Sequence, residues 1–84
     1  MKTISIELLK EILGIEKVYF EYMKQDGTIR KAYGTRQFTF IPEDKQPKNE
    51  ADGTLYENVR YFDLEKQEWR SIAKDVKEVD VVEQ

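Results

Sequence analysis

Apolar and polar residues alternate along residues 18–36, and the alternation is broken once, at the pair Asp26-Gly27. An Asp-Gly pair between two alternating runs is one of the strongest short-range signals for a β-hairpin. Each alternating run is typical of a β-strand, because successive side chains along a strand point to opposite faces. The pattern therefore predicts a two-stranded hairpin, and the other elements are interpreted around it.

The pairing of the two strands depends on the length of the turn between them. A loop of residues 25–27 places Glu21 opposite Lys31 and Met23 opposite Ile29, whereas a two-residue turn shifts every pair by one position. Opposite charges and matched apolar side chains stabilise cross-strand pairs. We therefore expect the three-residue loop.

This register assigns the side chains of the hairpin to two faces, which a slip of one residue would exchange. We also expect a bend at Gly34, because a glycine within a strand often marks a bulge or a barrel corner. The predicted core face holds Val18, Phe20, Ala32 and Gly34, and the predicted exposed face holds Tyr19, Glu21, Lys31 and Tyr33.

Residues 3–13 have the spacing of a short amphipathic helix, with apolar residues at helical intervals and charged residues between them. Thr3 or Ser5 is expected to be the N-cap, and Gly14 to end the helix in a left-handed conformation. A helix of this length is marginal alone in water. We expect it to cover one end or one face of a sheet, with partner binding as the alternative.

The polar stretch 43–57 has no periodicity and predicts a solvated loop. Pro42 ends the short apolar run before it. The remaining apolar runs predict strands at residues 38–41, 58–64, 68–73 and 76–83.

A second hairpin is expected to turn at residues 66–67. This turn would set Asp63 opposite Arg70 and Leu64 opposite Trp69. An Asp–Arg pair can be bidentate and would help to fix the register. We interpret Trp69 as a core residue because of its apolar partner.

One N-terminal helix followed by five or six short strands predicts a mainly β fold with an antiparallel sheet. The 84 residues have room for one core, so we expect a single domain over residues 1–84. The economical arrangement is a small SH3-like or Sm-like antiparallel barrel over residues 15–82, because closure of the sheet removes free strand edges.

Three short motifs occur in order along this predicted barrel: KxDGxxR from Lys24, GTR from Gly34 and DLExxxWRS from Asp63. In this order they resemble the small WYL-like family, whose members are found largely in phages and mobile elements. The resemblance covers roughly residues 18–72 and implies an Sm-like SH3 β-barrel, with the N-terminal helix and the acidic loop outside it. It implies no particular activity, although larger WYL domains in bacterial regulators are thought to sense ligands or nucleic acid.

The composition removes several classes of site. The chain has no cysteine and no histidine, so it lacks disulfides, thiolate metal ligands and the most common general base. We therefore expect no metal, no cofactor and no enzymatic activity. No apolar run reaches the roughly 20 residues of a membrane span and no secretory signal pattern opens the chain, so we expect a cytoplasmic protein.

The charge pattern leaves two functional hypotheses. The formal net charge is −3, which argues against general phosphate binding, although residues 17–36 carry a basic excess. We favour a protein-interaction module, because Tyr and Arg are frequent at interface hot spots. It would be a phage or mobile-element accessory protein that binds a host complex or further copies of itself. Self-association through the last strand, from Val76, is the expected route to a homo-oligomer.

The alternative is a small barrel that stacks the bases of nucleic acid on aromatic side chains beside a basic groove. Both hypotheses use the same candidate residues, which in a purely structural interpretation only pair across strands and cover the sheet. These candidates are Tyr19, Arg30, Lys31, Tyr33, Arg36, Tyr61 and Arg70.

Overall fold

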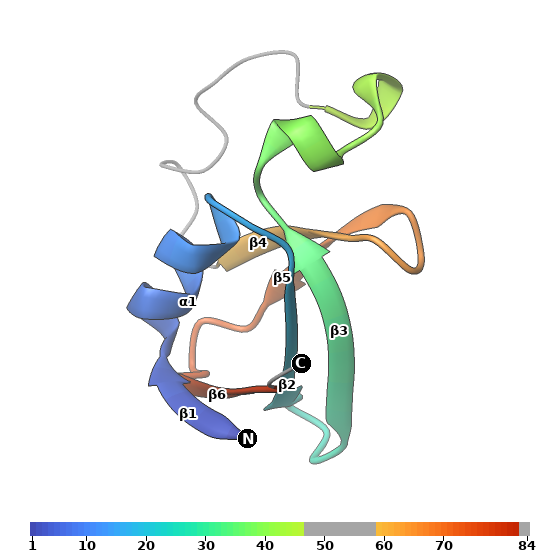
Figure 1. The fold of residues 1–84 in the computed structure, drawn as a ribbon. Helices are drawn as coiled ribbons and strands as arrows, with labels where there is room; N and C mark the ends of the chain where they lie inside the picture. The colour runs from blue at the N-terminus through green and yellow to red at the C-terminus, as the bar shows by residue number, and fades with distance from the viewer. Residues whose placement is uncertain (47–58, 83–84) are drawn as a thin grey trace.

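A computed structural model describes residues 1–46 and 59–82 as one antiparallel sheet with a short helix near the N-terminus (Figure 1). The strands lie in the order β1-β6-β2-β3-β4-β5. The elements are β1 (Lys2–Ser5), α1 (Ile6–Leu13), β2 (Val18–Met23), β3 (Ile29–Thr35), two 3-10 turns η1 (Phe38–Phe40) and η2 (Glu43–Lys45), β4 (Val59–Asp63), β5 (Glu68–Ile72) and β6 (Glu78–Val81).

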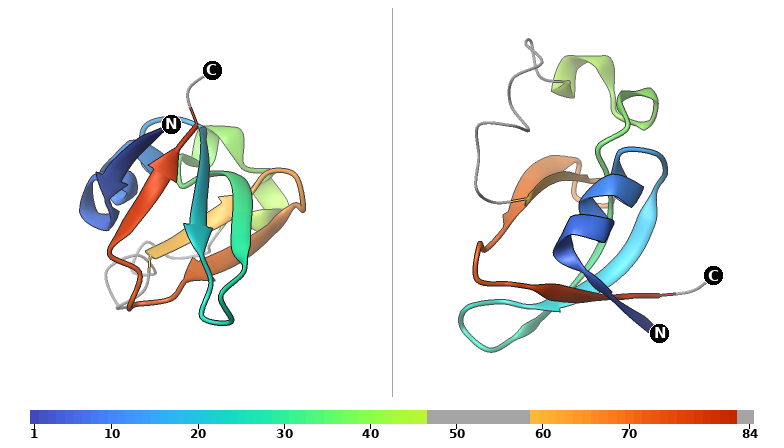
Figure 2. Two further views of the ribbon diagram at one scale, coloured as in Figure 1. Left: turned by 90° about the horizontal axis from the view of Figure 1, so that it is seen from below. Right: turned by 90° about the vertical axis from the view of Figure 1, so that its left-hand side faces the viewer.

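The sheet bends because β3 changes partner along its length. It pairs with β2 from Ile29 to Gly34 and with β4 only at its end, where Gly34 lies opposite Asp63. Figure 1 shows β4 crossing near the end of β3, and Figure 2 shows the bent sheet from two further sides. The prediction of a mainly β, Sm-like barrel with five or six antiparallel strands and a short N-terminal helix is confirmed, and the described sheet has six strands.

The register predicted for the first hairpin is confirmed. Glu21 lies opposite Lys31 and Met23 opposite Ile29. Gly27 has φ 87°, the left-handed conformation that the three-residue loop requires. The Asp26 carboxylate holds the turn, because it accepts hydrogen bonds from both the backbone N–H and the hydroxyl of Thr28, at 3.0 and 2.6 Å.

The N-terminal segment is part strand and part helix, so the prediction of a helix from residue 3 was wrong. β1 pairs with β6, and Ile4 is buried opposite Val79. Ser5 is the N-cap, as one of the two expected candidates, and its hydroxyl accepts the N–H of Leu8. Gly14 has φ −73°, so the expected left-handed stop was wrong.

The core lies between the bent sheet and α1. Leu9 and Leu13 of α1 are fully buried, and they join the inward side chains of β2, β3, β4 and β6 in one cluster. The largest fully buried side chains of this cluster are Tyr61 and Phe20, whose rings meet edge to face at 5.1 Å. The expected helix docking against the sheet therefore completes the core.

The strand predicted at residues 38–41 was wrong, because this segment satisfies its backbone locally. The N–H groups of Phe40 and Ile41 donate to the carbonyl groups of Gln37 and Phe38 in a 3-10 turn. The side-chain amide of Gln46 also donates to the segment, at 3.0 Å from two carbonyl oxygens. The backbone of residues 38–41 therefore forms its hydrogen bonds within a turn and not with a neighbouring strand, although its apolar residues alternate as in a strand.

The second hairpin exists, but its predicted register was wrong by two residues. Asp63 lies opposite Glu68, and Phe62 lies opposite Trp69. The turn is longer than expected because Gln67 adopts a left-handed φ of 57° and its N–H donates to the carbonyl of Asp63. Arg70 still contacts Asp63, diagonally across the strands.

The strand at the C-terminal end is internal, so the predicted free edge from Val76 was wrong. β6 pairs with β1 on one side and with β2 on the other. The two outer strands of the described sheet are β1 and β5. Of the predicted polar loop 43–57, residues 43–45 form η2, and residues 47–57 lie outside the described residues, as do Asn58 and Glu83 of the predicted strands.

Candidate functional site

One side of the β2–β3 hairpin is turned away from the core and carries three cross-strand pairs. We call this surface the hairpin outer face. It consists of the pairs Tyr19–Tyr33, Glu21–Lys31 and Met23–Ile29.

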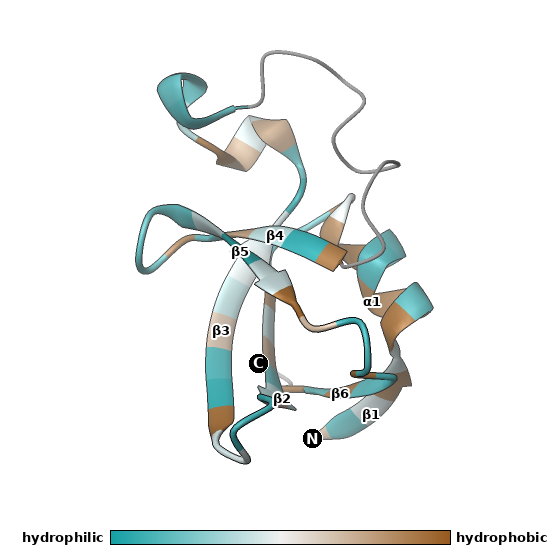
Figure 3. Ribbon diagram, turned by 180° about the vertical axis from the view of Figure 1, so that it is seen from behind, coloured by the Kyte–Doolittle hydropathy of each residue, from teal (hydrophilic) through white to brown (hydrophobic). Residues whose placement is uncertain are grey.

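The hairpin outer face combines stacked aromatic rings with exposed aliphatic side chains. The rings of Tyr19 and Tyr33 stack with their centroids 3.9 Å apart and an angle of 12° between their planes. Met23 is 58% exposed and Ile29 is 53% exposed. Figure 3 shows the hydrophobic colour at the start of β3, beside the turn. The surface therefore exposes apolar area where a strand normally carries polar side chains.

Two hollows border the hairpin outer face. One, of about 300 Å³, lies between the hairpin tip and β6 and is lined by Met23, Ile29 and Asp80 among others. The other, of about 280 Å³, is mainly apolar and lies where Tyr19 meets Val82. These hollows make the surface around the hairpin outer face uneven, whereas the face of a flat sheet has no such depressions.

A larger groove of about 480 Å³ lies on the other side of the hairpin, between its tip and the edge strand β5. We call it the mouth groove. It is lined by Tyr22, Lys24, Gln25, Asp26, Arg30, Trp69, Arg70, Ser71 and Ala73.

Two of the three cations in the mouth groove already have acidic partners. Arg70 lies 3.1 Å from Asp63 and 2.7 Å from Glu68, and Lys24 lies 3.9 Å from Asp26. Hydrogen bonds from Thr28 lower the pKa of Asp26, so this carboxylate stays charged. Arg30 is half-buried and has no ion pair with any residue in the described part of the chain.

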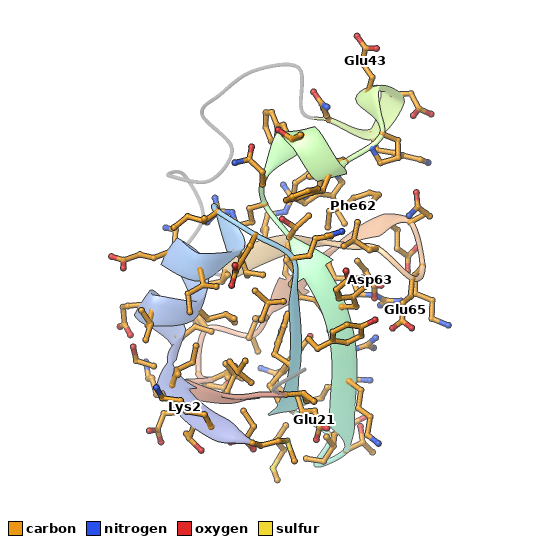
Figure 4. All side chains as sticks on the ribbon, viewed as in Figure 1. Lys2, Glu21, Glu43, Phe62, Asp63 and Glu65 are labelled. Carbon is orange, nitrogen blue, oxygen red and sulfur yellow. The ribbon has the colours of Figure 1, made fainter. Side chains whose placement is uncertain are left out.

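Asp63 holds the β4–β5 turn together and fixes the position of Arg70 in the wall of the mouth groove. It is 3% exposed, and its carboxylate accepts the N–H groups of Glu65 and Lys66 at 3.0 Å as well as the Arg70 guanidinium. Figure 4 shows Asp63 beside Glu65 at this turn. Arg70 is thus a structural partner of the turn as much as a surface cation.

Tyr61 is buried inside the barrel, so its prediction as a binding residue was wrong. Its hydroxyl lies 3.1 Å from the hydroxyl of Tyr22. Burial raises the pKa of the Tyr61 hydroxyl well above its usual range and the bond to Tyr22 raises it further, while the positive charge of Arg30 partly opposes the shift. Tyr61 therefore serves the core as a neutral hydrogen-bonded phenol.

The seven predicted site residues do not form one surface. Tyr19, Lys31 and Tyr33 share the hairpin outer face, whereas Arg30 and Arg70 line the mouth groove. Arg36 follows the far end of β3, six positions along the chain from Arg30, a rise of roughly 20 Å for extended strand. The structure thus supports no single basic and aromatic groove containing all seven.

The sequence-based prediction missed Met23 and Ile29 as surface residues and Trp69 as a groove residue. The alternation of β2 and β3 assigns Met23 and Ile29 to the same face as Tyr19, so the signal was an apolar pair at outward positions. Trp69 is half-buried, and its indole N–H donates to the Lys45 carbonyl at 2.7 Å. The interpretation of Trp69 as a core residue holds only in part.

The described residues include no group of three or more Asp or Glu side chains arranged to hold a metal ion. Within the same residues, no helix has the length and the apolar character needed to cross a membrane.

A family model, WYL_2 with an Sm-like SH3 β-barrel fold, matches residues 6–76. The chain belongs to this family. The WYL_2 match includes α1, which the resemblance seen in the motifs left out. The chain matches neither a curated protein nor a solved structure.

Proposed function

We propose that this WYL_2 barrel is a non-enzymatic protein-interaction module that docks a partner protein on the hairpin outer face. The observation that carries the proposal is the exposed stack of Tyr19 and Tyr33 in line with Met23 and Ile29. Aromatic residues and Met are enriched at protein interfaces, and centrally placed Tyr side chains are frequent hot spots.

The charges of this face favour a protein over nucleic acid. Lys31 is accompanied by Glu21 on the hairpin and by Asp80 on β6, which lies opposite Glu21. A surface that neutralises phosphates needs an excess of Lys and Arg. The hairpin outer face therefore suits a partner with apolar side chains and a mixed polar rim. We expect this partner among cytoplasmic proteins of a host cell, as the resemblance to phage and mobile-element proteins implies.

Affinity capture tests the proposal. The tagged chain is incubated with a lysate of its source cells, and each sample is divided and washed with or without nuclease. The wild type is compared with the double variant Met23→Gln/Ile29→Thr, which keeps the strand but removes the apolar pair. We expect a discrete protein that survives the nuclease and is lost from the double variant.

The matched control is Ile15→Thr, because Ile15 is 71% exposed but lies outside the hairpin. This variant should retain the captured protein. Capture that disappears with nuclease, or that the double variant retains at the wild-type level, would contradict the proposed function.

A further inference from the structure

Arg30 occupies an unusual position in the mouth groove. It lies opposite Tyr22 in the β2–β3 pairing, so its side chain leaves the hairpin on the side of the core and not on the hairpin outer face. It is half-buried, and no carboxylate of the described residues pairs with it. A partly desolvated guanidinium attracts an anion more strongly than a fully solvated cation does.

The charges around Arg30 limit the kind of anion. The groove walls contribute three cations, Lys24, Arg30 and Arg70. Three carboxylates accompany these cations. Asp26 lines the groove and pairs with Lys24, and Asp63 and Glu68 both pair with Arg70. Among the lining residues and their ion-pair partners the formal sum is zero, so a phosphate dianion or a polyanionic strand would meet as much negative charge as positive from them. A single monoanion on Arg30 meets less of this repulsion, because the Coulomb energy scales with the charge of the ligand.

The size and the lining of the groove limit the ligand further. Its volume of about 480 Å³ falls within the range of small-ligand sites and would hold a side chain with its adjoining backbone. Tyr22, Trp69 and Ala73 supply apolar wall, and Gln25 and Ser71 supply neutral hydrogen-bonding groups. A planar carboxylate matches the two parallel N–H donors of a guanidinium.

We propose that the mouth groove binds a carboxylate of a peptide, with Arg30 as its ion-pair partner. The carboxylate belongs either to the C-terminus of the peptide or to a Glu or Asp side chain. This site is separate from the hairpin outer face, so the proposed binding of a carboxylate does not depend on whether that face docks a protein.

Trp69 provides a direct measurement, because it is the single tryptophan of the chain and lines the groove. Its fluorescence is followed while peptides are added to the full chain. The probes are acetyl-Leu-Leu with a free C-terminal carboxylate, its neutral amide, and acetyl-Leu-Glu-Leu-amide. Inorganic phosphate and oligo-dT are titrated in parallel. We expect saturable binding of one or both carboxylate peptides, and the pattern identifies the source of the carboxylate.

Loss of the ion pair should weaken binding by about tenfold or more, since a hydrogen bond to a charged group is worth about 1.5–3 kcal/mol. The neutral amide should show this loss with the wild-type protein, and the carboxylate peptide should show it with Arg30→Gln. Lys10→Gln removes one positive charge from the exposed side of α1 and should bind as the wild type does. The comparison of carboxylate with amide needs no variant, so it stands even if Arg30→Gln unfolds.

Binding of the neutral amide as tight as that of the tighter-binding carboxylate peptide would overturn the proposal. So would no saturable response to either carboxylate peptide, or tighter binding of phosphate or oligo-dT.

Discussion

The ring of Tyr61 lies directly against the backbone of Gly34, where β3 turns from β2 to β4. A Cβ atom at Gly34 would stand 2.5 Å from Cδ2 of Tyr61 and 3.2 Å from the backbone oxygen of Phe62. The glycine expected to mark a bend therefore has a more specific role, because it leaves the space that Tyr61 fills. The GTR motif and the buried tyrosine are parts of the same packing arrangement.

Gly34→Ala is expected to destabilise the barrel by about 1–3 kcal/mol, as overpacking in a filled core does. The Tyr61 ring is fully buried and cannot move away without displacing its neighbours. Chemical denaturation measures the change in the free energy of unfolding. Gly14→Ala is the matched control, since Gly14 has a φ of −73° and room for a methyl group, and it should be neutral or slightly stabilising. Equal stability of the two variants would contradict this packing.

The buried hydroxyls of Tyr22 and Tyr61 should be energetically coupled. Tyr61→Phe leaves the Tyr22 hydroxyl without its partner and is expected to cost about 1–3 kcal/mol. The double change of both residues to Phe should cost less than the sum of the single changes, because it removes both polar groups together. A double-mutant cycle by denaturation measures this coupling, and strictly additive costs would contradict the hydrogen bond.

Burial of Tyr61 also predicts a loss of stability at alkaline pH. The pKa of Tyr61 is raised in the folded chain, so above pH about 10 the unfolded chain loses a proton that the folded chain keeps. This contribution is fully present below the ordinary tyrosine pKa and is lost as the pH rises above it, by at most about 1.4 kcal/mol per pH unit. Unfolding measured between pH 9 and about 12 should show a steeper decline for the wild type than for Tyr61→Phe. Parallel declines of the two proteins would contradict a raised pKa.

Asp63 and Glu68 both contact Arg70, yet we expect very different effects of their removal. Asp63→Ala leaves two backbone N–H groups and the Nε–H of Arg70 without their acceptor and should cost about 2–4 kcal/mol. The Glu68 side chain is 56% exposed, so Glu68→Ala should cost less than about 1 kcal/mol. Thermal or chemical unfolding of the two variants tests this ranking. A smaller effect for Asp63→Ala than for Glu68→Ala would mean that the turn does not depend on its carboxylate.

The sequence predicted best what depends on neighbouring residues. The register of β2 with β3 follows from one short turn and from charge and apolar pairs across it, all within residues 18–36. The N-cap at Ser5 is similarly local. The pairing of β1 with β6 joins residues more than 70 positions apart, and the periodicity of the N-terminal segment carries no signal for it.

The candidate site was harder to predict because β4 is buried on both faces. Tyr61 points into the barrel core, whereas Phe62 on the opposite face meets the ring of Trp69 at 5.6 Å. Alternation therefore could not assign one exposed face to this strand, and Tyr61 was mistaken for a surface residue. The outward side of β2 and β3 was predicted correctly. Its apolar pair, Met23 and Ile29, was used only to choose the strand register and was not recognised as part of an exposed surface.

Photocrosslinking tests the docking of a protein on the hairpin outer face most directly. Lys31 is replaced by p-benzoylphenylalanine on this face, and in a separate variant Lys10 is replaced on the exposed side of α1. After irradiation in the lysate, we expect a discrete, nuclease-resistant protein adduct from position 31 and none from position 10. An adduct to nucleic acid at position 31, or the same protein adduct from both positions, would contradict it.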